Sequence, residues 1–419
     1  MKKIFAIIMT VCMLASLLCI TASAADDAVL RVSAQKKDGT IVVVKDYTVF
    51  EDGWNAAMEL AVNSKELNKN DYARVIVDIY ADWNAVDGQF TQAFVNGKGF
   101  NWDAIYFQPN VKMTLNLNGH TVNRGLTEWE YNGEVMYIDE DADVIINDGT
   151  ITGGFSCNGA GGIHINDGAN VVLNNVNIVG NSTDDDDGAG IAVYGGATLT
   201  MNGGTITGNK AIGSSVGGGI YVNSANATLN DVLISDNVLS SNVAGIGYWA
   251  TGAGCCVSRG TLTLNRCTVK DNHSDRYGGG LALMYSGDLV VNNCTVTGNS
   301  AGIDGSAIAI IEEGSCLVDG SDATGNVNTE YNSIFYVQWG TLQFSNSQND
   351  PQISCWESGE VLFADVSETP VTTGSIFGTG SLALIVAFAA LAASIAAIGV
   401  NVASGKKKSS SAAGAAEAK

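Results

Sequence analysis

Acidic side chains cluster at one point of this 419-residue chain, where Asp184, Asp185, Asp186 and Asp187 are consecutive. Ca²⁺ is a hard cation that prefers several carboxylate and carbonyl oxygens, so this run is a candidate calcium site. Its spacing matches neither an EF-hand loop nor the calcium-binding nonapeptide repeat. A solvated acidic loop without a bound ion accounts for the same four residues, and both interpretations stay open.

A second group combines a base, an acid and a cation: His273, Asp275 and Arg276. These residue types can bind a polar ligand, and a merely polar surface loop is the alternative.

A third group is Tyr248 and Trp249, which lie in the longest insertion of the chain. Aromatic rings of this kind can stack on a sugar ring. Packing of the inserted loop against the rest of the protein explains them equally well.

The segments that must position these residues repeat along the chain. An Asn after an alternating apolar run recurs at intervals of 26 to 35 residues, and Asp319 and Ser345 take its place in the last two repeats. The marked positions are Asn118, Asn147, Asn174, Asn202, Asn230, Asn265 and Asn292. A second Asn follows seven residues later in most repeats, and a Gly-rich run such as "GGGIYV" leads into the next apolar segment. Such self-similarity, with strand-like alternation between turns, is the signature of a solenoid.

The repeats contain no helical segment, so the predicted fold class is all-β: a right-handed parallel β-helix of about ten coils. Each coil would have three short strands bent at Gly and Asn corners. Since alternate residues of a strand share a face, an interior row is predicted at Leu199, Met201, Ile206, Ile220 and Val222. Thr205 and Tyr221 are expected to point outward, and the marked Asn amides to stack in a ladder with left-handed backbone at the bends.

The repeats resemble those of the pectin-lyase-like superfamily of right-handed β-helix proteins, roughly over residues 40 to 365. "LNLNGHTV" (115–122) is similar to the first full coil of that family. The paired "GGGI" and "ITGN" elements are similar to the two short motifs of polymorphic outer-membrane proteins. The resemblance implies the fold but no single activity, because this fold includes lyases, hydrolases, esterases and non-catalytic adhesins.

The resemblance also implies what an enzyme of this fold would need. Its polysaccharide lyases use calcium-binding carboxylates with an Arg or Lys base, and these cannot be assembled here. Its hydrolases use closely spaced aspartates with G-H-G and R-x-K elements, and the sequence contains neither element. The outward row of the Gly-rich segments is mostly small and uncharged: His164, Ala192, Tyr221, Ala282 and Ala309. No catalytic residue is therefore assigned, and a non-enzymatic protein is favoured.

The first part of the chain is predicted to contain a leader, which is a secretory signal peptide, and a cap that covers the end of the β-helix. Residues 1–24 contain Lys2 and Lys3, an apolar run and "TASA", which is typical of a cleaved secretory signal peptide. Residues 25–110 are assigned to an N-terminal cap and the first strands, and residues 111–365 to the β-helix repeats. A helix is predicted over 51–67, with Trp54, Ala57, Leu60 and Ala61 on its apolar stripe. It would cover the open end of the β-helix.

The last part of the chain is predicted to anchor the protein at the cell surface. A short stalk is predicted at 366–380, a transmembrane helix at 381–403 and a cytoplasmic tail at 404–419, where three consecutive lysines follow the apolar run. Pro370, Thr373 and Gly374 lie in "PVTTG", which resembles a variant sortase signal. Linkage to the cell wall by a sortase and a permanent membrane helix are both open.

The net charge limits the classes of binding partner, and the cysteine positions bear on whether the core contains a disulfide. The formal net charge of −22 excludes nucleic acid and anionic lipid as partners. Seven of the nine cysteines remain after the leader. Cys267 and Cys294 occupy equivalent repeat positions, so they are expected to stack in the core. A disulfide between them and two small buried thiols are both compatible with the sequence.

These observations predict a cell-surface β-helix protein, adhesin-like or structural, that displays its inserted loops along one edge. The expected partner is a glycan or a protein of a host or neighbouring cell, and no cofactor is predicted apart from the possible calcium. The alternative is a polysaccharide lyase or hydrolase on the same scaffold.

Overall fold

The computed structural model describes residues 27–66, 72–85, 100–101, 104–241, 251–330, 333–349 and 352–364. The chain divides into two units, residues 1–376 and 377–419, and the second lies wholly outside the described residues. The predicted leader, stalk, transmembrane helix and tail also lie outside them, as do Tyr248, Trp249, Pro370, Thr373 and Gly374. Within the described ranges, no helix is long and apolar enough to cross a membrane.

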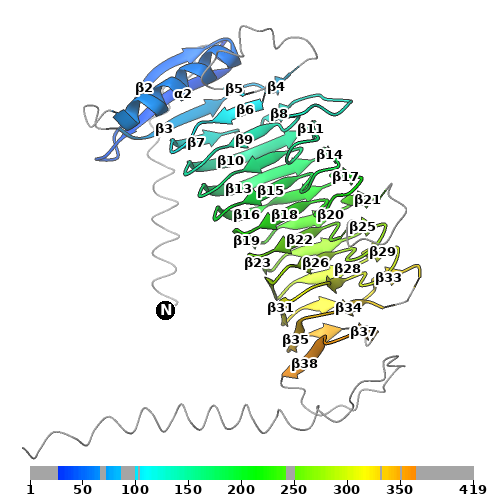
Figure 1. Cartoon of the computed structure of the whole chain (residues 1–419). Coiled ribbons are helices and arrows are strands. Elements are labelled where there is room, and N and C mark those ends of the chain that lie inside the picture. The colour runs from blue at the N-terminus through cyan, green and yellow to red at the C-terminus, as the bar shows by residue number, and fades with distance from the viewer. Residues whose placement is uncertain are drawn as a thin grey trace, which may run out of the picture. The chain divides into compact units, whose positions relative to one another are not determined.

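The chain winds through three β-sheets, each of which collects strands from successive coils (Figure 1). The largest sheet has 20 strands: β1 (Leu30–Lys36), β2 (Ile41–Tyr47), β3 (Tyr72–Ile79), β4 (Trp83–Asn84), β7 (Lys112–Asn116), β8 (Thr121–Asn123), β10 (Asp143–Thr152), β13 (Asn170–Val179), β16 (Thr198–Thr207), β19 (Asn226–Asn230), β20 (Leu233–Ser235), β23 (Thr261–Asn265), β24 (Thr268–Lys270), β27 (Gly287–Asn292), β28 (Thr295–Thr297), β31 (Gly314–Asp319), β32 (Asp322–Ala323), β35 (Thr341–Ser345), β36 (Gln348–Asn349) and β38 (Glu360–Ala364).

The second sheet has 11 strands: β5 (Phe100–Asn101), β6 (Ala104–Phe107), β9 (Met136–Ile138), β12 (Ile163–Ile165), β15 (Ile191–Tyr194), β18 (Ile220–Asn223), β22 (Cys255–Ser258), β26 (Leu281–Met284), β30 (Ile308–Ile310), β34 (Phe335–Val337) and β37 (Ile353–Cys355). The third has seven: β11 (Phe155–Ser156), β14 (Ser182–Asp184), β17 (Lys210–Ile212), β21 (Val238–Ser240), β25 (His273–Ser274), β29 (Ser300–Ala301) and β33 (Val327–Asn328).

The solenoid makes about eight turns, so the prediction of about ten coils was too high. The third sheet shows why, because only seven of the described turns contribute a strand to it. At the two ends, the described chain adds strands to the larger sheets without completing the third face. The predicted number of coils was obtained by counting every apolar run of the repeat. A complete turn of the solenoid needs a strand in each of the three sheets, so the number of turns is smaller.

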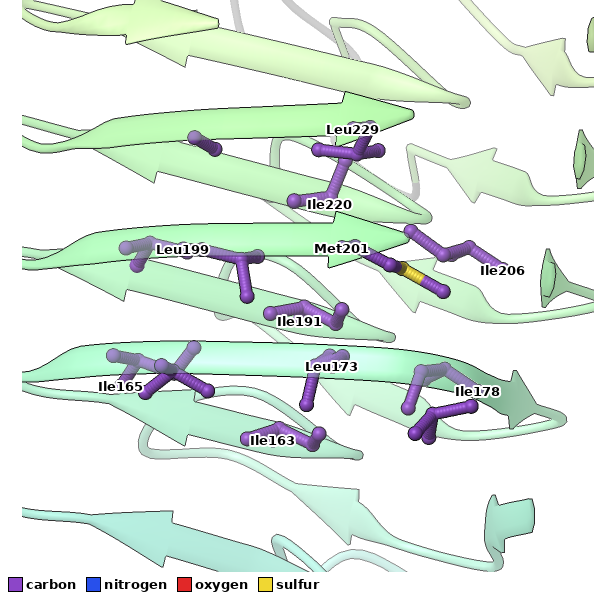
Figure 2. Packing of buried hydrophobic residues seen from close by; sticks show 14 of the residues in the cluster. Ile163, Ile165, Leu173, Ile178, Ile191, Leu199, Met201, Ile206, Ile220 and Leu229 are labelled. Carbon is purple, nitrogen blue, oxygen red and sulfur yellow. The ribbon is translucent and has the colours of Figure 1, made fainter. Parts of the chain in front are cut away.

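The interior is built as predicted. Leu199, Met201, Ile206, Ile220 and Val222 are each at most 1% exposed. Figure 2 shows equivalent residues of successive coils one above another, for example Leu173, Met201 and Leu229. Burying one such side chain stabilises the fold by roughly 1.5–3 kcal/mol, and the stacked rows form one continuous core along the solenoid.

The predicted Asn ladder is present. The side-chain amide of Asn202 donates to Asn174 Oδ1 at 2.9 Å, and that of Asn230 donates to Asn202 Oδ1 at 2.9 Å. Two details were wrong. The first member is Asn116, which accepts from Asn147 at 2.7 Å, instead of Asn118. The ladder residues also stay in the strands, and the following residue adopts the left-handed conformation, for example Asn175 with φ 51°.

The N-terminal cap differs from a lone helix. Helix α2 (Phe50–Glu66) packs its buried Trp54, Ala57 and Ala61 inward, while Leu60 is only partly buried. Trp54 meets Phe107 of β6 edge to face, with ring centroids 5.0 Å apart. Strand β1 pairs antiparallel with β2 and with β3, and β3 pairs parallel with β7 of the solenoid. A small antiparallel sheet, which the sequence analysis missed, therefore joins the helix to the first coil.

Candidate functional site

An aromatic row runs along the outer side of the 11-stranded sheet. Tyr137 of β9 and His164 of β12 are paired in register, and their rings stack with centroids 4.7 Å apart. Tyr194, the last residue of β15, lies 5.0 Å from the His164 ring. Tyr106 continues the row beyond Tyr137 and Tyr221 continues it beyond Tyr194, at 5.9 and 6.0 Å. Tyr106, Tyr137 and His164 occupy equivalent positions of successive coils, where His164 is followed by Ala192, and Tyr194 lies two residues beyond Ala192 on the same face of its strand.

A groove of about 470 Å³ opens over the centre of this row, and we call it the His164 groove. Tyr137, His164 and Tyr194 form its floor, and its walls come from the turns of neighbouring coils: Asn158, Gly159, Asn166, Asp167 and Asp186.

Hydrogen bonds between turns hold the walls in place. Asp186 Oδ2 accepts from the backbone N–H of Gly159 at 2.6 Å. The Asn166 amide donates to the Tyr137 hydroxyl and to Asp139 Oδ1, both at 3.1 Å. Each of these bonds joins one coil to the next, so the groove has a preformed shape.

The His164 imidazole is neutral at physiological pH. Burial lowers its pKa to about 4, because the charged form is poorly solvated there. Its Nδ1 is buried and has no hydrogen-bond partner among the described residues. Gly159 packs so closely that a Cβ at this position would lie 2.3 Å from His164 Nδ1. A buried polar atom without a partner is costly, which makes this imidazole the unsatisfied group of the groove.

The groove presents hydrogen-bonding groups of neutral or negative character. Its described lining contains two carboxylates, two amides, an imidazole and two phenols, with no Lys or Arg. Burial raises the pKa of Tyr137 to about 12, so its hydroxyl stays protonated. A ligand rich in hydroxyl donors matches this set better than an anion does.

Farther along the same face the predicted outward row is covered by protein. Ala192, Ala282 and Ala309 are at most 1% exposed, and Tyr221 is 6% exposed. Val216 packs with Tyr221 and Ala282, and Tyr277 packs against Ala309. Tyr221 points away from the core, as predicted, but it is not exposed to water, because the turns before the Gly-rich runs fold over this face.

The four aspartates do not point at a common centre. Asp185 Oδ1 accepts from Ser214 N–H at 2.9 Å, and Asp187 Oδ1 accepts from Val216 N–H at 2.7 Å. Asp184 lies on β14, and Asp186 is a wall of the His164 groove. Within the described ranges, no three His, Cys, Asp or Glu side chains are arranged to hold a metal ion. Three of these carboxylates fix turns of adjacent coils, and calcium binding here stays a prediction.

Of the predicted group His273, Asp275 and Arg276, the structure brings the side chains of His273 and Asp275 together. His273 Nε2 lies 3.2 Å from Asp275 Oδ1, and its Nδ1 lies 2.8 Å from Ser300 Oγ. Asp275 Oδ2 also accepts from Ser241 N–H at 2.9 Å. Arg276 contributes its backbone to the turn, where its carbonyl accepts from Ile303 and Asp304. The group starts on β25, three strands from β14 in the third sheet, which is about 14 Å at the usual strand spacing. The His273 and Asp184–Asp187 groups are thus separate.

The insertions do follow one corner of the coil, as predicted, but they begin with the strands of the third sheet. Successive first residues pair in register, for example Lys210 with Val238 and Val238 with His273. A strand of two or three residues gives too little alternation to be recognised in the sequence.

The sequence analysis missed a buried ion cluster next to the groove. Glu134 and Arg124 are each 2% exposed, and Arg124 donates to Glu130 Oε2 at 2.9 Å and to the Asn132 carbonyl at 3.0 Å. Burial raises the pKa of Glu134 to about 7. These residues lie in the long connection between β8 and β9, where the sequence repeat has no equivalent positions.

A second groove, of about 940 Å³, follows the turns after the 11-stranded sheet near the C-terminal end. Its lining includes Arg259, Tyr285, Glu312 and Trp339. The Arg259 guanidinium lies 4.7 Å from the Tyr285 ring centroid. This groove contains both charges, so it differs in character from the His164 groove.

The three-sheeted parallel winding and its stacked Asn ladders define a β-helix scaffold. Residues 104–349 match the family model described as the right-handed β-helix region, and the chain belongs to this family. Comparisons with the curated proteins and with the solved structures found no match.

Proposed function

We propose that this protein is a non-enzymatic, adhesin-like β-helix of the cell surface that binds a glycan in the His164 groove. One observation carries the proposal: an open groove on a rigid sheet is lined by two phenols, two amides and two carboxylates, with no Lys or Arg among its described residues. Sugar hydroxyls can donate to the carboxylates and accept from the phenols and amides.

The regular architecture supports binding of a polymer. Tyr137, His164 and Tyr194 come from three successive coils, which are about 4.8 Å apart, so an extended chain lying along the groove would meet a ring from each of these coils. The edges and hydroxyls of the stacked rings face the groove, because their faces are turned toward one another. Recognition therefore depends mainly on hydrogen bonds, which tolerate water at the interface.

The surface location is part of the proposal and rests on sequence. The leader, the apolar run at 381–403 and the lysines after it would export the chain and retain its C-terminal end in the membrane or wall. The net charge of −22 favours an uncharged glycan over a nucleic acid or an anionic membrane. A protein of a neighbouring cell is the other partner considered.

The test is a glycan array probed with the purified full-length chain in detergent. Replacing Asn166 with Ala, or replacing His164 with Ala and so removing the ring between Tyr137 and Tyr194, should displace the Tyr137 hydroxyl and weaken binding of the recognised glycan about tenfold, the value of one to two hydrogen bonds. Trp339→Ala, in the second groove, is the matched control and should bind like the wild type. Equal loss in the control, or binding only to a protein, would contradict the proposed site. Chelation of Ca²⁺ in the same assay tests the Asp184–Asp187 prediction.

A carbohydrate-cleaving enzyme is the second candidate, favoured by the Glu134 carboxyl beside the groove. A carboxyl with a pKa of about 7 has the protonation that a general acid needs near neutral pH. Glu134 is 2% exposed and is not among the residues that line the groove, so the surrounding turns would have to open before it could reach a ligand. Release of new sugar ends from a bound polysaccharide, lost in Glu134→Gln, would replace the adhesin proposal with this one.

A further inference from the structure

Cys267 and Cys294 lie next to each other in successive coils of the core. The residues that flank them are paired in register, Asn265 with Asn292 and Thr268 with Thr295. Each cysteine follows a residue in the left-handed conformation, Arg266 with φ 55° and Asn293 with φ 52°. The same local backbone sends both side chains in the same direction, one above the other.

The contacts of the two thiols confirm this stacking. The backbone N–H of Cys267 donates to Cys294 Sγ at 3.3 Å. The Cys267 thiol donates to the Leu229 carbonyl at 3.3 Å, and the Cys294 thiol donates to the equivalent Leu264 carbonyl at 3.5 Å. Neighbouring parallel strands are about 4.8 Å apart, which lies within the range of about 4.4–6.8 Å between the Cα atoms of a disulfide.

A hydrogen bond between the two thiols lowers the pKa of Cys267 and raises that of Cys294. The thiolate is the reactive form of cysteine. Because both thiols make equivalent contacts in their own coils, either can react first with a disulfide, and the other then resolves the mixed disulfide.

We propose that Cys267 and Cys294 form a thiol–disulfide redox site whose oxidant is a low-molecular-weight disulfide such as oxidised glutathione. In the first step the thiolate of one of the two cysteines attacks one sulfur of the oxidant, forms a mixed disulfide and displaces one glutathione thiolate. In the second step the thiolate of the other cysteine attacks the protein sulfur of the mixed disulfide and displaces the second glutathione thiolate. Two protein thiols are oxidised, and the oxidant is reduced to two glutathione molecules that take up the two protons.

Burial sets when this reaction occurs. Cys267 is 1% exposed and Cys294 is 3% exposed, so the oxidant reaches them only while the coil is open. Once formed, the bond closes a loop between residues 27 positions apart and ties two coils together. Such a crosslink restricts the unfolded chain and thereby stabilises the folded one.

In earlier coils the positions equivalent to these cysteines are occupied by valine, which indicates a substitution that the core should tolerate. The equivalent positions of earlier coils are Val176 and Val232, both buried, and Val232 precedes Cys267 in the same column. Cys267→Val and Cys294→Val should therefore fold. Cys316, a buried cysteine in register with Leu289, serves as the control, in the variant Cys316→Val.

In the experiment, the full-length chain is incubated with oxidised glutathione in urea just below the unfolding transition, so that coils open reversibly. Free thiols are then alkylated under denaturing conditions before intact-mass analysis and peptide mapping. The expected result is a chain that carries two alkyl groups fewer than the reduced and fully alkylated chain, and a crosslinked peptide that joins Cys267 to Cys294. The melting temperature should rise on oxidation and return on reduction.

Each variant has a defined outcome. Cys267→Val and Cys294→Val should lose both the crosslink and the redox-dependent shift of the melting temperature, whereas Cys316→Val should keep both. Complete alkylation of Cys267 and Cys294 in the oxidised wild type would overturn the proposal. So would a crosslink from Cys267 to the neighbouring Cys255, which is also buried in the core.

Discussion

At the scale of single residues, buried ionisable groups lie beside the outer face of the 11-stranded sheet. Glu134 is held by its neighbours: Ser156 Oγ donates to its Oε2 at 3.4 Å, and Arg124 lies close enough to lower its pKa slightly against the larger effect of burial. The folded protein therefore keeps a proton on Glu134 up to about pH 7, whereas an unfolded Glu releases it near pH 4.3.

This difference predicts how stability depends on pH. Because the folded state binds the extra proton, the contribution of Glu134 is fully present below about pH 4 and is lost as pH rises through about 7. Glu134→Gln keeps the shape and removes the titration. The variant should unfold with a free energy roughly 1–3 kcal/mol higher than the wild type at pH 8 and nearly equal at pH 4. Urea unfolding at both pH values measures this, and an identical pH dependence in the variant would refute the assignment.

At the scale of elements, two Asn ladders hold the coils together, one in the strands and one in the interior. The second Asn of each repeat is buried, with Asn209, Asn237 and Asn272 fully shielded from solvent. Asn237 Oδ1 accepts from both the backbone N–H and the side-chain amide of Asn209, at 3.0 and 2.9 Å. Its own amide donates to the Ile206 carbonyl at 3.0 Å and to Asn272 Oδ1 at 2.9 Å.

The buried ladder should therefore matter more than the one in the strands. Asn237→Ala leaves several buried donors and acceptors of its neighbours without partners and should cost about 2–5 kcal/mol of folding free energy. Asn230→Ala removes a similar side chain where water can replace it, and should cost less than about 1 kcal/mol. Chemical denaturation of both variants provides the comparison. Equal costs would mean that the interior ladder contributes no more than the solvated one.

The same elements show what sequence can predict. Alternation placed Met201 and Val222 inside, because one face of each strand must be buried along the whole core. The ladder register failed only at Asn118, because Leu117 to His120 form a turn whose extra residues shift the pattern. Strand β25, with two residues, carries no periodicity, and the antiparallel pairing of β1 with β3 depends on contacts far apart in the chain. The His164 groove was missed for a related reason: its walls come from turns of different coils, which only the register brings together.

At the scale of the whole molecule, the proposed function depends on how the solenoid is presented. Glycan binding at the cell surface, as proposed, requires that the protein is retained there with the His164 groove accessible. The segment that would do this, residues 366–419, follows the last described strand β38. Its composition offers two routes: a helix that remains in the membrane, or a sorting signal cleaved within "PVTTG".

Deletion of residues 382–419 should release the protein into the medium by either route, because both need the apolar run for retention. Replacing Thr373 with Ala separates them. A sortase would cleave between Thr373 and Gly374, so the wild-type protein would co-purify with peptidoglycan, and Thr373→Ala would abolish that linkage. A permanent helix would leave Thr373→Ala unchanged, and detergent would extract the intact chain, with residues 382–419 detectable by mass spectrometry. Thr372→Ala is the matched control, since it alters the neighbouring threonine without removing the Thr–Gly bond. If the chain lacking residues 382–419 stays with the cells, the anchor lies elsewhere in the protein, and the surface assignment based on this segment fails.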